Sequence, residues 1–152
     1  MSPGFASTRE RVDRVRARAW ALQVLYLWET RGATGPARDA LAETAAHRRI
    51  SPRRLPYLRA VLAALDAHRE EVDAHLEAAL ENWRLDRLAV VDRALLRLAA
   101  AEMLHLEDIP PRVSIQEAVR LAEQYGGAES PRFVNGVLDA LYRGVLKGGG
   151  TP

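Results

Sequence analysis

The sequence predicts an all-α protein, a compact bundle of about seven helices in one domain. Apolar residues recur at spacings of three and four through most of the chain, the period of an amphipathic helix. No segment shows the period-two alternation of a half-buried strand, and start and stop signals divide the chain into helical segments. With 152 residues, 48% of them hydrophobic, the chain can bury one substantial core but not two.

The first predicted helix spans residues 7–31. Ser7 and Glu10 form a capping box at its start, in which each side chain satisfies a free backbone N–H, and Gly32 ends the helix. Residues 1–6 and 148–152 have few groups to bury. We therefore expect a disordered N-terminus and a flexible tail on either side of a single helical domain of residues 7–147.

Four further helices are predicted in the middle of the chain. Gly35-Pro36 marks the start of the first of these helices, and Ser51-Pro52 marks the start of the second. The exact start of the second helix stays open, because Pro56 also fits only in the first turn of a helix. Asp86 is the expected N-cap of the last, which is strongly apolar on one side. These helices span residues 36–48, 52–68, 69–81 and 87–105.

Two more helix starts lie in the C-terminal part of the chain. Ser114 and Glu117 form a second capping box, and Ser130 is an expected N-cap with proline at the next position. The two helices span residues 114–125 and 130–146, with Gly126-Gly127 between them. Polar residues gather around the last start beside Phe133, which suggests a recognition surface. They are Glu129, Arg132, Asn135 and Asp139.

Composition excludes several classes of protein. No apolar run is long enough to span a membrane, and the N-terminus lacks the apolar stretch of a secretory signal. The sequence contains no cysteine, which rules out disulfides and thiol catalysis. We expect a cytoplasmic protein with no membrane association.

The net charge of +2 conceals an asymmetry along the chain. Residues 1–60 carry 12 Arg against 5 acidic residues, whereas residues 61–152 carry 10 basic against 15 acidic residues. A basic half and an acidic half predict two partners of opposite charge, one of them a nucleic acid. The alternative is an uneven scatter of charge without functional meaning.

The sequence offers little basis for catalysis. It contains no HExxH pair and no glycine-rich phosphate loop. His68, Glu71 and His75 fall at positions i, i+3 and i+7 of a possible helix face, a pattern that could ligate a metal ion. A solvated, charged helix face explains the same residues, and we adopt that interpretation. We expect no enzymatic activity, no metal and no cofactor.

The strongest binding signal lies in the first helix, where five arginines between Arg9 and Arg18 are opposed only by two acidic residues. Arg11, Arg14 and Arg18 share one helical face, opposite an apolar face. Guanidinium groups bind phosphate bidentately and stack on bases. Tyr26 lies two turns further on and offers a ring for an unpaired base. A solvated basic face with Tyr26 half-buried in the core fits the residue types equally well.

Three ordered motifs over about 120 residues resemble the NusB family. The first is Arg14-x-Arg16-x-Arg18 followed by Ala21-Leu22-Gln23-Val24-Leu25-Tyr26-x-Trp28. The second is the segment from Trp83 to Glu102. The third comprises Ile109-Pro110, Val113-x-Ile115-x-Glu117-Ala118-Val119, Glu129-Ser130 and the F-V-N-G-V-L-D run from Phe133 to Asp139, which is the most specific of all.

The resemblance implies an all-helical fold of two small sub-bundles and a role in transcription antitermination. A factor of this family binds the boxA element of ribosomal RNA leaders jointly with ribosomal protein S10, also called NusE. The complex acts on RNA polymerase and suppresses premature termination. With Arg11 added from the helical face, the expected RNA-binding residues are Arg11, Arg14, Arg16, Arg18, Tyr26, Glu129 and Phe133. The expected S10-binding residues are Glu81, Asp86 and Asp92.

Two alternative functions stay open. The same helical domain resembles the N-terminal part of a ribosomal RNA cytosine methyltransferase, but we expect no catalytic domain because no Rossmann-like segment or nucleophilic cysteine follows Tyr142. The other alternative is a self-associating helical module. Some members of the family form homodimers that could cover the arginine helix, so a homodimer is compatible with the first function.

Overall fold

The computed structural model of the chain describes residues 7–147, which form six α-helices and no strand. The expected disordered N-terminus and flexible tail lie outside the described residues. The α-helices are α1 (Thr8–Thr30), α2 (Ala37–His47), α3 (Leu55–Ala79), α4 (Val90–His105), α5 (Pro111–Tyr125) and α6 (Ser130–Leu141). Short helical turns lie at Pro52–Arg54 and Leu85–Arg87, and a π-helical segment at Tyr142–Lys147. None of the described helices is long and apolar enough to cross a membrane.

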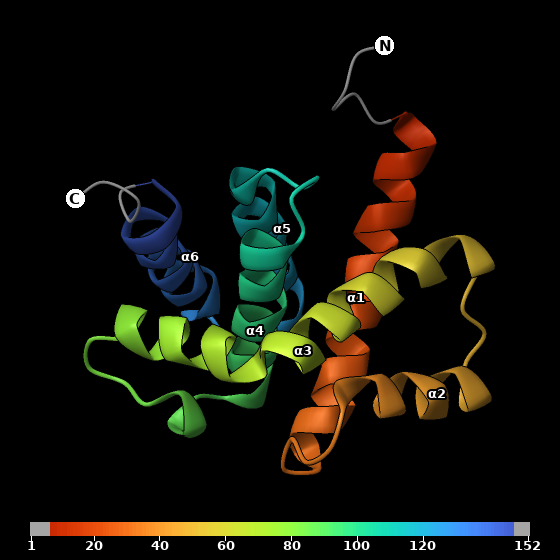
Figure 1. The fold of residues 1–152 in the computed structure, drawn as a ribbon, viewed down its shortest axis with the longest axis horizontal. Helices are drawn as coiled ribbons and strands as arrows, with labels where there is room; N and C mark the ends of the chain where they lie inside the picture. The colour runs from red at the N-terminus through yellow and green to blue at the C-terminus, as the bar shows by residue number, and fades with distance from the viewer. Residues whose placement is uncertain (1–6, 148–152) are drawn as a thin grey trace.

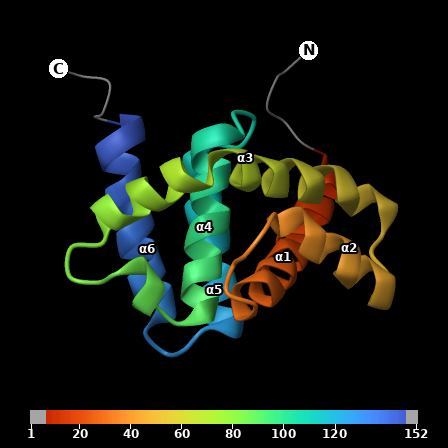
Figure 2. The ribbon, with the colours of Figure 1, turned by 60° about the horizontal axis from the view of Figure 1, so that its bottom comes forward.

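The helices form two sub-bundles that share α3. Figure 1 shows α1 and α2 on one side of the molecule and α4, α5 and α6 on the other, with α3 running across both. The view in Figure 2 agrees with this arrangement. With 25 residues, α3 is roughly 37 Å long and can reach from one sub-bundle to the other. The all-α prediction is therefore confirmed, and so is its division into two sub-bundles.

The predicted break near residue 68 is a kink inside α3 rather than the end of a helix. His68 has non-helical backbone angles, φ −126° and ψ 25°, and α3 continues beyond it. The prediction of two separate helices over residues 52–81 is wrong in this respect, and it accounts for the difference between seven predicted and six observed helices. Buried leucines precede the kink, and the buried Val72 and Leu76 follow it, so both parts of α3 contribute to the core.

The central helix is α4, which is buried on every side from Ala94 to Met103. Such a helix is covered by neighbours all round. Small side chains allow this approach, since four alanines are among the ten consecutive buried residues. Two charged residues, Arg97 and Glu102, are also buried in α4 and require partners from the helices around it.

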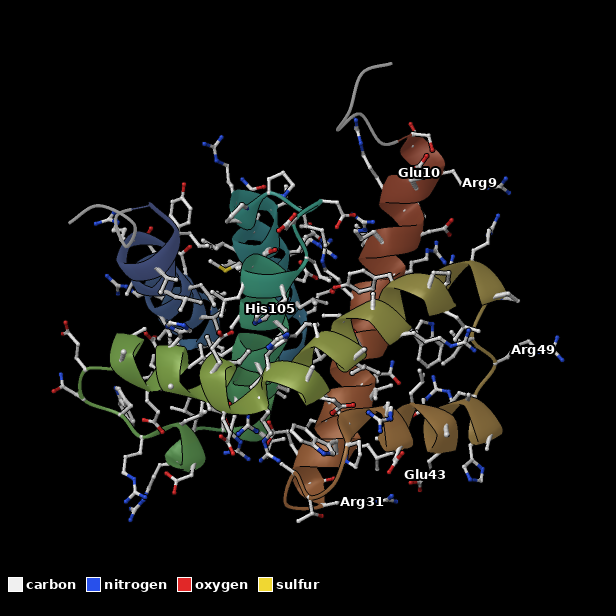
Figure 3. The ribbon with its side chains drawn as sticks, in the orientation of Figure 1. Arg9, Glu10, Arg31, Glu43, Arg49 and His105 are labelled. Carbon is white, nitrogen blue, oxygen red and sulfur yellow. The ribbon has the colours of Figure 1, made fainter. Side chains whose placement is uncertain are left out.

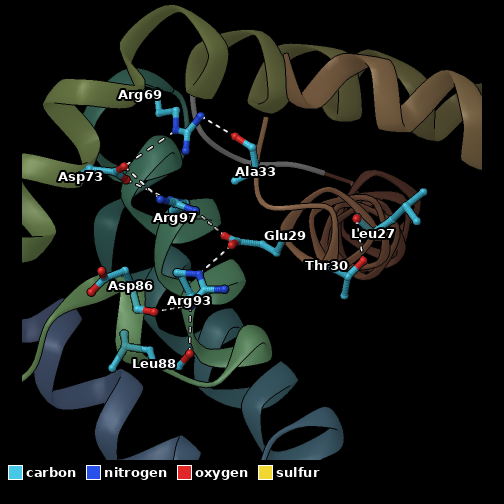
Figure 4. Close-up of polar contacts among 10 residues, drawn as sticks. All are labelled: Leu27, Glu29, Thr30, Ala33, Arg69, Asp73, Asp86, Leu88, Arg93 and Arg97. Carbon is cyan, nitrogen blue, oxygen red and sulfur yellow. Dashed lines mark hydrogen bonds and ion pairs between the residues drawn. The ribbon is translucent and has the colours of Figure 1, made fainter. Parts of the chain in front are cut away.

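A buried ion network joins α1, α3 and α4 (Figure 4). Glu29, at the end of α1, accepts hydrogen bonds from Arg93 at 2.6 Å and from Arg97 at 2.5 Å. Arg97 also donates to both carboxylate oxygens of Asp73 in α3, at 2.9 and 3.0 Å. Burial alone would lower the pKa of Arg97, but the hydrogen bonds to Asp73 and the charges of Glu29 and Asp73 outweigh it and raise that pKa. The network fixes the orientation of the three helices.

One of the predicted N-caps is confirmed and three are wrong. The Ser7 side chain accepts a hydrogen bond from the Glu10 N–H at 3.1 Å. Ser114 instead lies inside α5, which begins at Pro111, and its hydroxyl donates to Glu102 at 2.7 Å. Asp86 lies in a short turn before α4, whose N-cap is Ala89. Ser130 is the first residue of α6, and its hydroxyl accepts from the N–H of the preceding turn at Gly127, at 3.0 Å.

Candidate nucleic-acid interface

The N-terminal half of α1 presents three of the predicted arginines at or near the surface. Arg11 and Arg16 are exposed. The side chain of Arg14 is 39% exposed, pairs with Asp108 at 3.3 Å, and lies 5.7 Å from the ring centre of Tyr57. The outer end of the helix projects from the bundle, as the labelled Arg9 and Glu10 show in Figure 3. These three arginines can reach a ligand without rearrangement of the fold.

Arg18 is buried, so the prediction that it shares an exposed face with Arg11 and Arg14 is wrong. Only 3% of its surface is exposed, and its Nε donates to Glu102 at 2.7 Å. Glu102 also accepts from the hydroxyls of Tyr57 and Ser114. Arg18 follows Arg14 by one turn on the same face, but at this point α1 crosses α4. Helical periodicity places residues on a face and does not reveal where another helix covers that face.

A groove of about 480 Å³ lies between α1 and the connection from α4 to α5. Its charges are mixed, because three acidic residues face the arginines, and its remaining lining is apolar. Arg18 lies at its base, and the Arg18 Nη2 has no hydrogen-bond partner within the described part of the chain. The lining residues are Glu10, Arg11, Arg14, Val15, Arg18, Asp108, Ile109, Pro110, Val113 and Glu117.

Arginines from outside α1 extend the basic surface, and sequence reasoning missed them. Asp13 interrupts the arginine run of α1, but Arg53 and Arg54 lie 3.8 and 3.4 Å from its carboxylate. Both come from the short turn that precedes α3. Arg53 remains half exposed, whereas Arg54 is largely covered. The negative charge of Asp13 is therefore neutralised within the protein, beside the exposed Arg16.

A third arginine joins this surface from the connection between α2 and α3. The guanidinium of Arg48 lies 5.2 Å from the Trp20 ring centre, and its Nη1 donates to the Gln23 side chain at 3.4 Å. Trp20 and Gln23 lie on the same face of α1 as Arg16. We call Arg16, Arg48 and Arg53 the basic patch. Its two arginines from outside α1 are distant in sequence from the arginine run, so no local pattern could have revealed them.

Tyr26 lines a shallow groove of about 380 Å³ that continues from the basic patch along α1. Tyr26 is 46% exposed, and Tyr125 at the end of α5 is 51% exposed. Gln23 lines this groove and also bonds to Arg48, so it connects the two surfaces. We call it the tyrosine groove, and it is lined by Leu22, Gln23, Tyr26, Val91 and Tyr125. An aromatic residue directly before Gly126-Gly127 was the available signal for Tyr125.

Phe133 lies in a separate groove between the end of α3 and α6. Its ring meets the Trp83 ring edge to face, with 6.1 Å between centres, and Trp83 is 58% exposed. Glu81, an expected S10-binding residue, lines the same groove of about 370 Å³. The structure therefore brings together two residues that the sequence assigned to different partners. Glu129 is exposed and is the N-cap of α6.

The other acidic residues expected to bind S10 occupy two environments. Asp86 is exposed and pairs with its neighbour Arg84 at 3.0 Å. Asp92 is partly buried in the first turn of α4, next to Val91 of the tyrosine groove. Its Oδ1 has no hydrogen-bond partner within residues 7–147. Asp92 therefore offers a carboxylate oxygen in the first turn of α4, where the helix dipole favours negative charge.

These features define an all-α protein with an arginine-bearing helix and two grooves lined by aromatic rings, a class of domain suited to bind a polyanion. The sequence profile of the NusB family matches residues 15–143. The chain belongs to the NusB family.

Relatives and solved structures agree with this assignment. The transcription antitermination protein NusB of Desulfitobacterium hafniense is 39% identical over 136 residues, which cover 90% of this chain and 92% of the relative. The solution structure of NusB from Aquifex aeolicus matches with a TM-score of 0.76 and 32% identity, covering 89% of this chain and 90% of that one. A crystal structure of antitermination factors NusB and NusE in complex with dsRNA matches with a TM-score of 0.75 and 30% identity, covering 90% and 98% of the two chains.

Proposed function

We propose that this protein is a transcription antitermination factor that binds boxA RNA of ribosomal RNA leaders jointly with ribosomal protein S10 (NusE). The observation that carries the proposal is the continuous surface along α1, where the basic patch meets the tyrosine groove at Gln23. The protein acts by binding, without a catalytic step, as part of an antitermination complex on RNA polymerase. This activity belongs in the cytoplasm, where nascent bacterial RNA is made.

The RNA strand follows α1 in this proposal. Arg16 and Tyr26 are ten residues apart, roughly 15 Å along the helix, so a few nucleotides of single strand can contact both. Arginines of the basic patch bind phosphates, and Tyr26 and Tyr125 stack on bases. Arg11 and Arg14 lie on the other side of α1 and are proposed contacts to a flanking segment of the RNA. Arg18 is a positioning residue that holds α1 against α4 through Glu102.

The last helix and the acidic residues complete the assignment. Phe133 and Glu129 are proposed RNA contacts at the start of α6, where the exposed Trp83 extends the aromatic surface. Asp86 and Asp92 are proposed contacts to the basic S10, and so is Glu81. Because Glu81 and Phe133 share one groove, RNA and S10 meet there in this arrangement.

A titration of boxA-like single-stranded RNA at low salt, with and without S10, tests the proposal. We expect weak binding by the chain alone and tighter binding when S10 is present, and an absence of any gain with S10 would refute the joint function. Tyr125→Ala should weaken RNA binding by about 1–3 kcal/mol if a base stacks there. Arg143→Ala, an exposed arginine near the far end of α6, serves as the control and should bind normally.

The same titration distinguishes self-association. A homodimer that covers α1 would make the apparent RNA affinity fall as the protein concentration rises. Sedimentation velocity over the same range of concentration reports the oligomeric state directly. A constant affinity together with a monomer at all concentrations would remove this alternative.

A further inference from the structure

A cluster of metal-ligating side chains lies where α3 crosses α4, outside the surfaces described above. His68 and Glu71 come from α3, and His105 is the last residue of α4. One potential ligand atom of each side chain lies within 4.8 Å of the others. Figure 3 labels His105 on α4, and its ring contacts His68 and Glu71 of α3. We propose that these three residues bind a divalent transition-metal cation of the zinc class.

The kink and the end of α4 together build the cluster. His68 and Glu71 are three residues apart, so they lie on one face of α3, and the non-helical backbone of His68 bends the helix at this point. His105 ends α4, where the partial negative charge of the helix dipole favours a cation. The sequence pattern pointed to His75 as the third ligand, but His75 lies outside the cluster. The third ligand comes from another helix, which spacing within one segment could not reveal.

The donor atoms suit a zinc-class ion. Two imidazole nitrogens and one carboxylate oxygen form a ligand set found in zinc sites, where the Zn–N distance is about 2.0–2.1 Å. Two ligands of one tetrahedral ion are then roughly 3.3 Å apart. His105 Nε2 already lies 2.5 Å from a Glu71 oxygen, and the His68 and His105 rings stack with 3.7 Å between centres. Binding requires the two rings to tilt out of this stack and the hydrogen bond between His105 and Glu71 to open from 2.5 Å to roughly 3.3 Å. Any pair of ligand atoms near the 4.8 Å limit must move together by roughly 1.5 Å.

The described residues around the cluster leave the ligating side chains room to move and place no cation against the bound ion. His68 is exposed, half of the Glu71 side chain is exposed, and 19% of the His105 side chain is exposed, so an ion can enter from solvent and keep a water ligand. The nearby cation Arg69 is turned away, because its Nη1 donates to the Ala33 carbonyl at 2.6 Å and its guanidinium lies over Trp28. Glu70 is exposed beside the cluster and adds negative charge. A bound ion would cross-link α3 at its kink to the C-terminal end of α4.

Titration of the tag-free, chelator-treated chain tests the site. Zn²⁺ binding is followed by calorimetry, and Co²⁺ binding by the visible absorption that distinguishes a protein-bound ion from the hydrated one. We expect one ion per chain and a loss of affinity of at least about tenfold in His68→Gln and in His105→Gln. His75→Gln lies on the same helix outside the cluster, and it should bind as the unaltered chain does.

Thermal unfolding gives a second readout. Zn²⁺ at about 100 times its Kd should raise the Tm of the unaltered chain by roughly 5–10 °C and leave that of His68→Gln unchanged. The proposal is overturned if the unaltered chain takes up no stoichiometric ion, or if His75→Gln loses as much affinity as His68→Gln. If His105→Gln does not fold, Glu71→Gln replaces it, since Glu71 is exposed, and retention of full affinity in Glu71→Gln together with His68→Gln overturns the proposal.

Discussion

Replacing Arg18 by alanine removes a buried guanidinium from the junction of α1 and α4. Glu102, whose side chain is 1% exposed, then keeps only the hydroxyls of Tyr57 and Ser114. Loss of one partner from a buried ion pair costs about 3–5 kcal/mol, because the remaining charge is left uncompensated. The Arg18 Nη2 has no hydrogen-bond partner among the described residues, so the intact pair is incompletely satisfied. We therefore expect a loss near the lower end, about 3 kcal/mol.

A loss of that size is easy to measure. It is a large fraction of the roughly 5–15 kcal/mol by which a domain is stable, and for a chain of this length it lowers the Tm by about 10 °C. Urea unfolding followed by circular dichroism should show a lower midpoint at an unchanged slope. Arg16→Ala is the matched control, an exposed arginine two residues earlier, and its stability should stay within about 0.5 kcal/mol.

RNA binding should distinguish the two variants in the opposite way to stability: Arg16→Ala should change it and Arg18→Ala should not. Arg16→Ala should reduce the dependence of log affinity on log salt by about 0.7, the value for one phosphate contact on a single strand. Arg18→Ala should keep the slope of the unaltered chain at a temperature where it is folded. Full stability of Arg18→Ala combined with a reduced salt slope would show that Arg18 contacts RNA, and would refute its burial against Glu102.

Further substitutions, two of them with a matched control, test other parts of the molecule. Glu29→Gln removes the buried charge between Arg93 and Arg97 and should lower the free energy of unfolding in urea by about 3 kcal/mol. Glu43→Gln is the control, because it breaks only an exposed pair with Arg31 and should leave urea unfolding unchanged. Gly126→Ala would place a Cβ 2.5 Å from that of Ser130 and should cost about 1–3 kcal/mol in the same assay. A Cβ at Gly136 would meet open space inside α6, so Gly136→Ala should raise the free energy of unfolding by about 0.5–1 kcal/mol. Equal effects of the two glycine substitutions would contradict the close approach of Gly126 to Ser130. Asp92→Lys should abolish S10 binding in a pull-down while circular dichroism stays normal, and undiminished S10 binding would remove Asp92 from that interface.

The sequence predicted the helices well and their caps poorly, for one physical reason. Each helix buries an apolar stripe, and this stripe is visible in the local spacing of residues. A serine or aspartate near a helix start has several competing partners, and the tertiary structure decides among them. Ser114 donates to Glu102 from another helix, and Asp86 pairs with Arg84 in a turn. Ser7 caps as predicted at the exposed end of α1.

The candidate site was predictable only where its residues lie close together in the sequence. The arginines of α1 and Tyr26 belong to one helix, so their spacing gave their relative positions. Tyr125 lines the same groove as Tyr26 because of the way α5 packs, and Arg48 lies over Trp20 because of the connection after α2. Such contacts depend on which helices pair and at what register. Neither is encoded in a local pattern, and the burial of Arg18 escaped prediction for the same reason.

Part of the charge asymmetry along the chain is neutralised by ion pairs within the molecule. Arg14, Arg18 and Arg38 of the basic half pair with acidic residues of the other half, at Asp108, Glu102 and Asp66. The basic surface that faces solvent is therefore smaller than the composition suggests.

This internal pairing sets an upper limit on RNA binding by the chain alone. If Arg11, Arg16, Arg48 and Arg53 supply the phosphate contacts, four contacts on a single strand give a salt slope of about −3, and the affinity without S10 should be low. A slope steeper than about −4, measured from 50 to 200 mM salt, would require more phosphate contacts than these arginines can make. It would mean that the internal ion pairs open on RNA. A slope near −3 that steepens when S10 is added would instead indicate that S10 supplies the missing positive charge.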